Sequence, residues 1–164
     1  LYIGFVNFED WLIFDYKTNK TGETFIDLYI KNSTGLKDDE RTLLNKIKGS
    51  LLSLYEAVSV SKDKMVVLED LLMGVEVSLK EKALTKGLKK GDIFAARLLP
   101  IDRGHAMSGS VYPFRAEDKK TVLEYVSRMF RRYTKNENPK GTMKDFLRDY
   151  GDVFNMAWIR IIAG

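Results

Sequence analysis

The chain has 164 residues, 45% of them hydrophobic and 12% aromatic, and its 27 Lys and Arg against 23 Asp and Glu give a formal net charge of +4. This composition predicts a folded chain with a sizeable core and the length of one domain. The absence of cysteine excludes disulfide bonds, a thiol nucleophile, a thiolate zinc site and an iron–sulfur cluster. Because His105 is the single histidine, an imidazole-rich site is excluded as well. We therefore expect neither a metal site nor a cofactor in this chain.

We expect no secretory signal in this segment, since no charged region precedes an apolar run of signal-peptide length. The longest apolar stretch, residues 153–163, is interrupted by Asn155 and Arg160 and is too short to span a bilayer. The P-loop, dinucleotide-binding, nucleophile-elbow and zinc-protease motifs do not occur. These observations predict a cytoplasmic chain without a transmembrane segment.

The N-terminal third of the chain has the patterns of three helices. Apolar residues at helical spacing predict a largely buried helix over residues 5–16. Thr24 and Asp27 have the spacing of a capping box, which opens a short helix over residues 25–31. A third helix starts at Asp38 with three acidic residues in its first turn, where they favour the positive end of the helix dipole.

The middle of the chain changes to strand periodicity. Turn-forming residues divide it into short segments, which predicts hairpins. Because closure hides the open edges of a small antiparallel sheet, we expect an SH3-like or OB-like barrel. The basic stretch over residues 86–92 is predicted to be a turn that leads into the fourth strand. The five predicted strands cover residues 51–60, 65–71, 75–80, 92–101 and 105–114.

Two helices complete the chain. The first covers residues 116–134 and has one apolar and one basic side. The second follows a polar linker, is capped by Thr142 with Asp145, and has one broad apolar face. We thus predict an α+β fold packed as one globular unit. Its parts are an N-terminal helical segment (1–50), a small barrel-like sheet (51–114) and a C-terminal helical pair (115–164).

Short sequences along the chain carry a family resemblance: WLIFDY (11–16), SLYEA (53–57), LEDL (68–71), GDIFAARL (91–98) and SG (108–109). Together they resemble an uncharacterised bacterial domain that is often carried by proteins with a SEC-C zinc-binding motif. The resemblance spans residues 5–114 and consists of core and turn patterns, so it implies a fold and no catalytic residue. SEC-C motifs ligate zinc through Cys and His, so in a chain without cysteine that motif is absent or lies outside this segment.

The basic side of the helix over residues 116–134 suggests contact with nucleic acid. Residues 115–164 hold 11 basic and 7 acidic residues, and arginines at helical spacing can neutralise several phosphates at once. The alternative is an ordinary solvated helix surface, because Glu124 lies within it. The candidate nucleic-acid-binding residues on this helix and the preceding basic turn are Lys86, Lys89, Lys90, Arg128, Arg131, Arg132 and Lys135.

The last helix suggests a protein interface instead. Trp158, Ile161 and Ile162 crowd the end of the chain, where few elements remain to cover them. They would bind a partner protein or a second copy of the chain. The alternative is that they close the domain's own core.

Three carboxylates and the histidine are candidates for catalysis. Asp10, Asp15 and Asp27 sit beside bulky apolar residues, a setting that raises a carboxyl pKa and can create a general acid. The sequence indicates no partner for these three carboxylates, and His105 has no acid or nucleophile nearby. Plain structural roles explain most such residues.

Strand aromatics provide a further candidate. Tyr55, Phe94, Tyr112 and Phe114 are expected mostly in the core, and a base-stacking patch of Tyr112 and Phe114 beside residues 86–90 requires them to be exposed. The sequence as a whole favours a non-catalytic binding module for a protein or a nucleic acid. A carboxylate-based hydrolase or nuclease is the alternative.

Overall fold

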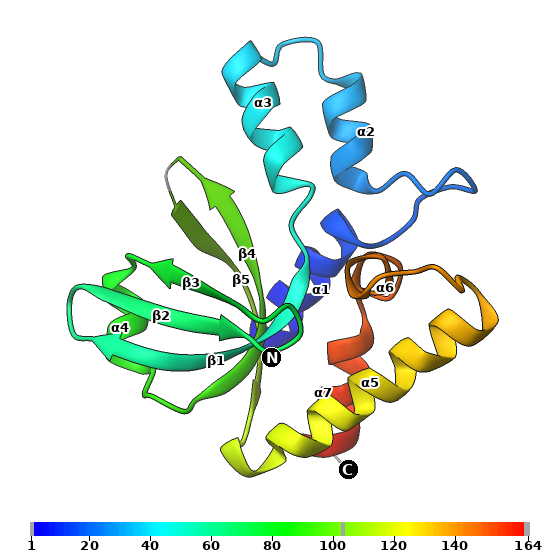
Figure 1. The fold of residues 1–164 in the computed structure, drawn as a ribbon. Helices are drawn as coiled ribbons and strands as arrows, with labels where there is room; N and C mark the ends of the chain where they lie inside the picture. Colours follow the sequence, from blue (N-terminus) through cyan, green and yellow to red (C-terminus); the bar gives the residue numbers. More distant parts are fainter. Residues whose placement is uncertain (1, 103, 163–164) are drawn as a thin grey trace.

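The computed structural model describes residues 2–102 and 104–162 (Figure 1). Its strands form one antiparallel sheet: β1 (Leu52–Ser61), β2 (Met65–Asp70), β3 (Val75–Leu79), β4 (Ile93–Ile101) and β5 (Gly104–Phe114). A 3-10 turn covers Ala116–Asp118. The helices are α1 (Tyr2–Phe14), α2 (Phe25–Asn32), α3 (Asp38–Ile47), α4 (Lys82–Gly87), α5 (Lys119–Asn136), α6 (Met143–Asp149) and α7 (Val153–Ile162).

The sheet has the strand order β3-β2-β1-β4-β5, so β1 is central and β3 and β5 are the outer strands. All five predicted strands are confirmed to within one residue at each end. Within the described residues, no ladder joins β3 to β5, and the sheet is open. The expected closed barrel of the SH3 or OB type is therefore not confirmed. The outer edge of β5 is covered instead by α1 and α7, which contact that strand.

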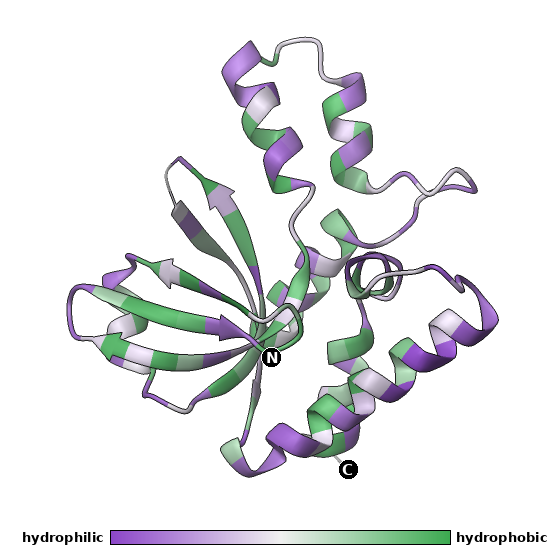
Figure 2. Cartoon of the chain, viewed as in Figure 1, coloured by the Kyte–Doolittle hydropathy of each residue, from purple (hydrophilic) through white to green (hydrophobic). Residues whose placement is uncertain are grey.

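Hydrophobic residues are buried on both faces of the sheet. One core includes Leu54 and Tyr112 and is covered by α5, α6 and α7. The other includes Leu68 and Phe94 and receives the side chains of Leu84 in α4 and of Leu88 just after it. Burial on both faces explains why β4 reads as a nearly continuous apolar run in place of an alternation. Figure 2 shows the hydrophobic residues concentrated in the strands, while hydrophilic residues alternate with them along α5.

The helix α1 is less buried than its sequence predicts. Phe5 and Phe8 are 60% and 53% exposed, whereas Asn7 and Asp10 are buried on the side of α1 that faces the sheet. Apolar residues surround the whole helix, so only one of its sides can pack on β5. The side of α1 that packs on the sheet holds the polar residues Asn7 and Asp10, because their hydrogen-bond partners lie on the strands β5 and β4. The prediction of a largely buried helix is wrong for this reason.

The helices α2 and α3 form a pair that rises above the sheet in Figure 1. The capping box of Thr24 and Asp27 is confirmed at the start of α2, and Ile26 and Ile30 are the buried residues of that helix. The acidic first turn of α3 is confirmed as well, but α3 has no buried residue. The pair therefore adds little to the core.

The C-terminal region differs from its prediction at one point. The predicted last helix is divided into α6 and α7 at Tyr150, Gly151 and Asp152. Gly151 is buried against the side chain of Asp15, so the chain bends where another element approaches it closely. The helix α4 is not predicted from the sequence. Residues 86–92 are expected to form only a turn, but the first two of them belong to this helix.

Candidate ligand-binding groove

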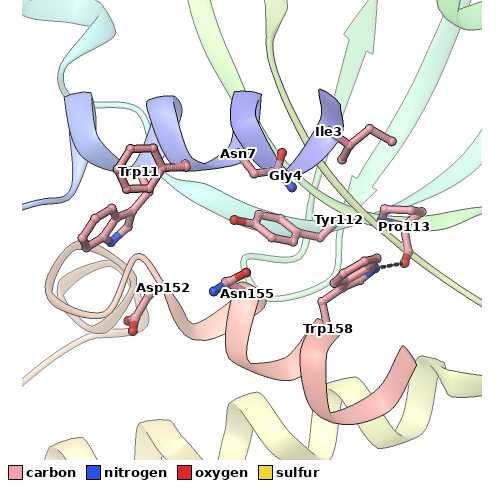
Figure 3. Close-up of a pocket in the computed structure, with 10 residues that line it drawn as sticks. Ile3, Gly4, Asn7, Trp11, Tyr112, Pro113, Asp152, Asn155 and Trp158 are labelled. Carbon is pink, nitrogen blue, oxygen red and sulfur yellow. Dashed lines mark hydrogen bonds between the residues drawn. The ribbon is translucent and has the colours of Figure 1, made fainter. Parts of the chain in front are cut away.

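A groove of about 570 Å³ lies between α1, β5 and α7 (Figure 3). Figure 3 shows the ring of Tyr112 in its middle, with Trp11 towards one end and Trp158 towards the other. Both tryptophans of the chain line this groove. The remaining lining residues are Ile3, Gly4, Asn7, Phe8, Pro113, Asp152 and Asn155.

Two side chains hold the walls of the groove to the outer edge of β5. The Asn7 amide donates to Val111 O at 2.9 Å and accepts from Val111 N at 2.8 Å, as a neighbouring strand would. The indole Nε1 of Trp158 donates to Pro113 O at 2.9 Å. Because Pro113 has no N–H, its carbonyl is its one backbone group that can form a hydrogen bond, and this bond satisfies it. These bonds hold α1 and α7, which form the walls of the groove, along the outer edge of β5.

Tyr112 supplies the hydroxyl group at the base of the groove. Burial of the ring, together with the negative charges of Asp10, Asp15 and Asp152, raises the pKa of Tyr112 to about 12 against the opposing effect of Arg97. The hydroxyl therefore keeps its proton at neutral pH. Within the described part of the chain it has no hydrogen-bond partner, so it is available to a ligand.

Beneath the groove lies a buried ion cluster of Arg97, Asp10 and Asp15. Arg97 is fully buried, and its guanidinium donates to Asp10 Oδ1 at 2.9 Å, Asp15 Oδ2 at 2.5 Å and Ser50 O at 2.7 Å. The same guanidinium lies over the Phe14 ring, 4.6 Å from its centroid. With all three groups ionised, two carboxylates share one guanidinium, so the cluster carries one excess negative charge.

That shared arrangement changes the titration of Asp15. Burial, with a smaller contribution from the negative charge of Asp10, raises the pKa of Asp15 to about 6, because together these effects exceed the lowering by Arg97. Burial is the larger cause, and the excess negative charge adds to it, because one guanidinium only partly compensates a second carboxylate.

We predict that the stability advantage of the protonated Asp15 is complete below about pH 4 and is lost as pH rises through about 6. The folded state holds this proton more tightly than the unfolded chain, so the free energy of unfolding falls over that interval, by about 3 kcal/mol from this group. Urea unfolding of the wild type and Asp15→Asn, compared at each pH, isolates the effect. A wild-type advantage that grows with pH would show that the pairing with Arg97 dominates instead.

The lining of the groove is suited to a cationic side chain with an apolar stem. Phe8, Trp11 and Trp158 offer aromatic surface, and the exposed Asp152 stands at the rim. Asp152 forms no ion pair within the described residues. Aromatic faces attract cations, and the alkyl stem of Lys or Arg packs well on them.

The predicted basic residues lie in different places. Arg128 and Arg132 line a hollow between α5 and α7, which the sequence does not reveal, together with Arg160 of α7. Arg131 lies on another side of α5, beside Lys120 and Glu124, and Lys135 is exposed near the end of that helix. Lys86 lies in the last turn of α4, and Lys89 and Lys90 follow that helix in a turn; α4 packs on β2.

Two of the three predicted interface residues at the chain end pack inward. Trp158 and Ile161 are half-buried against the first core, as the alternative of core closure expects. The side chain of Ile162 lies outside the described residues. The exposed apolar residues of α7 are Met156 and Ile159.

The catalytic candidates have structural partners. The expectation that Asp10 and Asp15 lack a partner is wrong, because Arg97 binds both. Asp27 caps α2 and pairs with Lys48, and His105 is half-buried opposite Pro100 in the β4–β5 ladder. In the part of the chain that the structure describes, no group of three His, Asp or Glu could hold a metal ion.

The strand aromatics are in the core. Tyr55, Phe94, Tyr112 and Phe114 are each at most 7% exposed, which confirms their expected burial. The base-stacking patch of Tyr112 and Phe114 is thereby overturned, since stacking requires exposed ring faces.

These features define an α+β domain with an open sheet and an aromatic groove at its edge. A family model described as a family of unknown function (DUF7986) matches residues 6–150, and the chain belongs to this family. The match agrees with the resemblance to an uncharacterised domain but contains no link to SEC-C proteins. No curated protein matches the chain, and no solved structure does. Among the described helices, none has the length and apolar character to cross a bilayer.

Proposed function

We propose that this domain is a non-catalytic binding module that recognises a basic segment of a partner protein through the groove between α1, β5 and α7. The observation that carries the proposal is the combination of aromatic side chains with Asp152 in one groove. A lysine or arginine side chain would lie along the tryptophans and place its charge beside Asp152. The Tyr112 hydroxyl and the Asn155 amide would bind the partner's backbone or polar groups.

The negative charge of Asp152 and of the Arg97 cluster favours a cation over an anion in this groove. Asp152 is exposed at the rim, and the Arg97 cluster below Tyr112 has one negative charge in excess when its carboxylates are ionised. A cation–π contact contributes about 0.5–1 kcal/mol at an exposed site and more when water is excluded. A neutral apolar side chain would bury the same surface without this contribution.

A hydrolase or nuclease that uses buried carboxylates has less support. Asp10 and Asp15 are both engaged by Arg97 beneath the groove, and Asp27 is engaged at the start of α2. A protein-binding groove does not require these carboxylates to leave their partners, because the residues that line the groove make the contacts.

The test uses the two tryptophans as reporters, because both line the groove. Blocked tripeptides of the form Ala-X-Ala, with X as lysine, arginine, trimethyllysine or norleucine, are titrated while tryptophan fluorescence is recorded. Norleucine has the apolar stem of lysine without its charge. We expect the lysine peptide to bind roughly fivefold more tightly than the norleucine peptide, which corresponds to about 1 kcal/mol.

The matched variants are Asp152→Asn and Glu76→Gln. Asparagine is as good a residue as aspartate before a helix, so the first variant removes the charge at the start of α7 with little cost in stability. Glu76 is exposed on β3, away from the groove lining, and its variant has the same net charge. Asp152→Asn should reduce the preference for lysine and leave norleucine binding unchanged, whereas Glu76→Gln should change neither. Equal affinity of the wild type for lysine and norleucine would contradict the proposal.

A further inference from the structure

A second hollow, of about 540 Å³, lies between α5 and α7. It borders the groove, because Asp152 lines both. Its character differs, since three arginines from two helices surround it. The lining residues are Tyr125, Arg128, Met129, Arg132, Tyr150, Asp152, Val153, Met156 and Arg160.

Two of these arginines converge on one aromatic ring. The guanidinium carbons of Arg128 and Arg160 lie 5.4 and 5.6 Å from the centroid of the buried Tyr125 ring. Stacking holds both groups at the hollow although their charges repel. An anion that binds between them would relieve this repulsion.

In the part of the chain that the structure describes, no acidic side chain pairs with the three guanidinium groups. Among the described residues, Arg128, Arg132 and Arg160 form no ion pair, whereas Arg115 and Arg148 do. Asp152 is the acidic residue of the lining, and its carboxylate lies beyond ion-pair distance from all three. The hollow therefore has three sets of donors that no neighbouring carboxylate uses.

We propose that this hollow binds the phosphate backbone of a nucleic acid. Guanidinium groups match phosphate oxygens with paired donors, and their charge is permanent. Lys135 is exposed three residues after Arg132 on the same helix and extends the positive surface beyond the hollow, as a polyanion requires and a single phosphate does not. This inference does not depend on the proposed function of the groove.

The experiment measures fluorescence anisotropy of a labelled single-stranded oligonucleotide with the whole chain over a series of salt concentrations. If the three arginines neutralise three phosphates, the plot of log affinity against log salt has a slope of about −2, at roughly 0.7 per phosphate. The variant Arg128→Gln/Arg132→Gln/Arg160→Gln should bind at least about tenfold more weakly at low salt and lose most of the slope.

The matched control is Lys86→Gln/Lys89→Gln/Lys90→Gln, which removes the same charge at the other predicted basic site. It should keep the wild-type slope. Arg132→Gln alone leaves both stacked arginines on Tyr125, so a loss of about one phosphate from the slope is measurable even if the triple variant unfolds. An equal loss in the lysine variant would overturn the proposal. Tighter binding of a phosphoserine peptide than of the oligonucleotide would also overturn it.

Discussion

Replacing Arg97 with leucine is expected to lower the free energy of unfolding at neutral pH by about 3–5 kcal/mol. The arginine is fully buried and is the shared partner of Asp10 and Asp15. Leucine fills part of the space but leaves two buried carboxylates without a counter-charge, which is the costly way to break an ion pair. Urea unfolding followed by circular dichroism measures the loss.

The compensating variant shows whether charge or packing causes the loss. Adding Asp10→Asn and Asp15→Asn to Arg97→Leu removes the uncompensated charges, so we expect it to recover part of the stability of the wild type. A loss below about 1 kcal/mol in Arg97→Leu would mean that the cluster contributes little, since surface pairs have effects of that size.

The second large effect is expected at Gly151, which joins α6 to α7. A Cβ atom at this position would lie 2.3 Å from Asp15 Cγ and 2.6 Å from Asp15 Oδ2. Asp15 cannot move aside without breaking its 2.5 Å bond to Arg97. We therefore expect Gly151→Ala to cost about 2–3 kcal/mol of unfolding free energy, at the upper end of overpacking effects.

Gly35→Ala is the matched control, because a Cβ atom there has no heavy atom within 4 Å. It should leave the midpoint of urea unfolding nearly unchanged. If Gly151→Ala behaves like Gly35→Ala, the junction of α6 and α7 must be able to shift away from Asp15, which would contradict this account of the close contact.

The sequence predicts the local elements well because their signals are local. Alternation and turn residues locate the strands, and Gly74, with a φ of 67°, completes the β2–β3 turn where the sequence expects it. The two capping boxes at Thr24 and Thr142 are confirmed for the same reason. The exposed face of α1 and the break before α7 depend on contacts between distant segments, which periodicity does not contain.

The groove and the ion cluster illustrate that limit. Arg97 stands within an apolar run of β4, which indicates a buried charge, and a buried charge needs a partner of opposite sign. Asp10 and Asp15 have apolar neighbours and are candidates for that partner. The sequence does not show that these residues meet, since 82 residues separate Asp15 from Arg97. In the same way, Arg160 joins Arg128 and Arg132 only because α5 and α7 pack together.

The most direct test of the binding groove is the nuclear magnetic resonance spectrum of the two indole N–H groups. The chain has two tryptophans, Trp11 and Trp158, and both line the groove. Titration with the lysine tripeptide should shift both indole signals along saturable curves with one dissociation constant, and the norleucine tripeptide should need a higher concentration. Indole signals that stay in place while other signals move would contradict the assignment of the groove as the binding site.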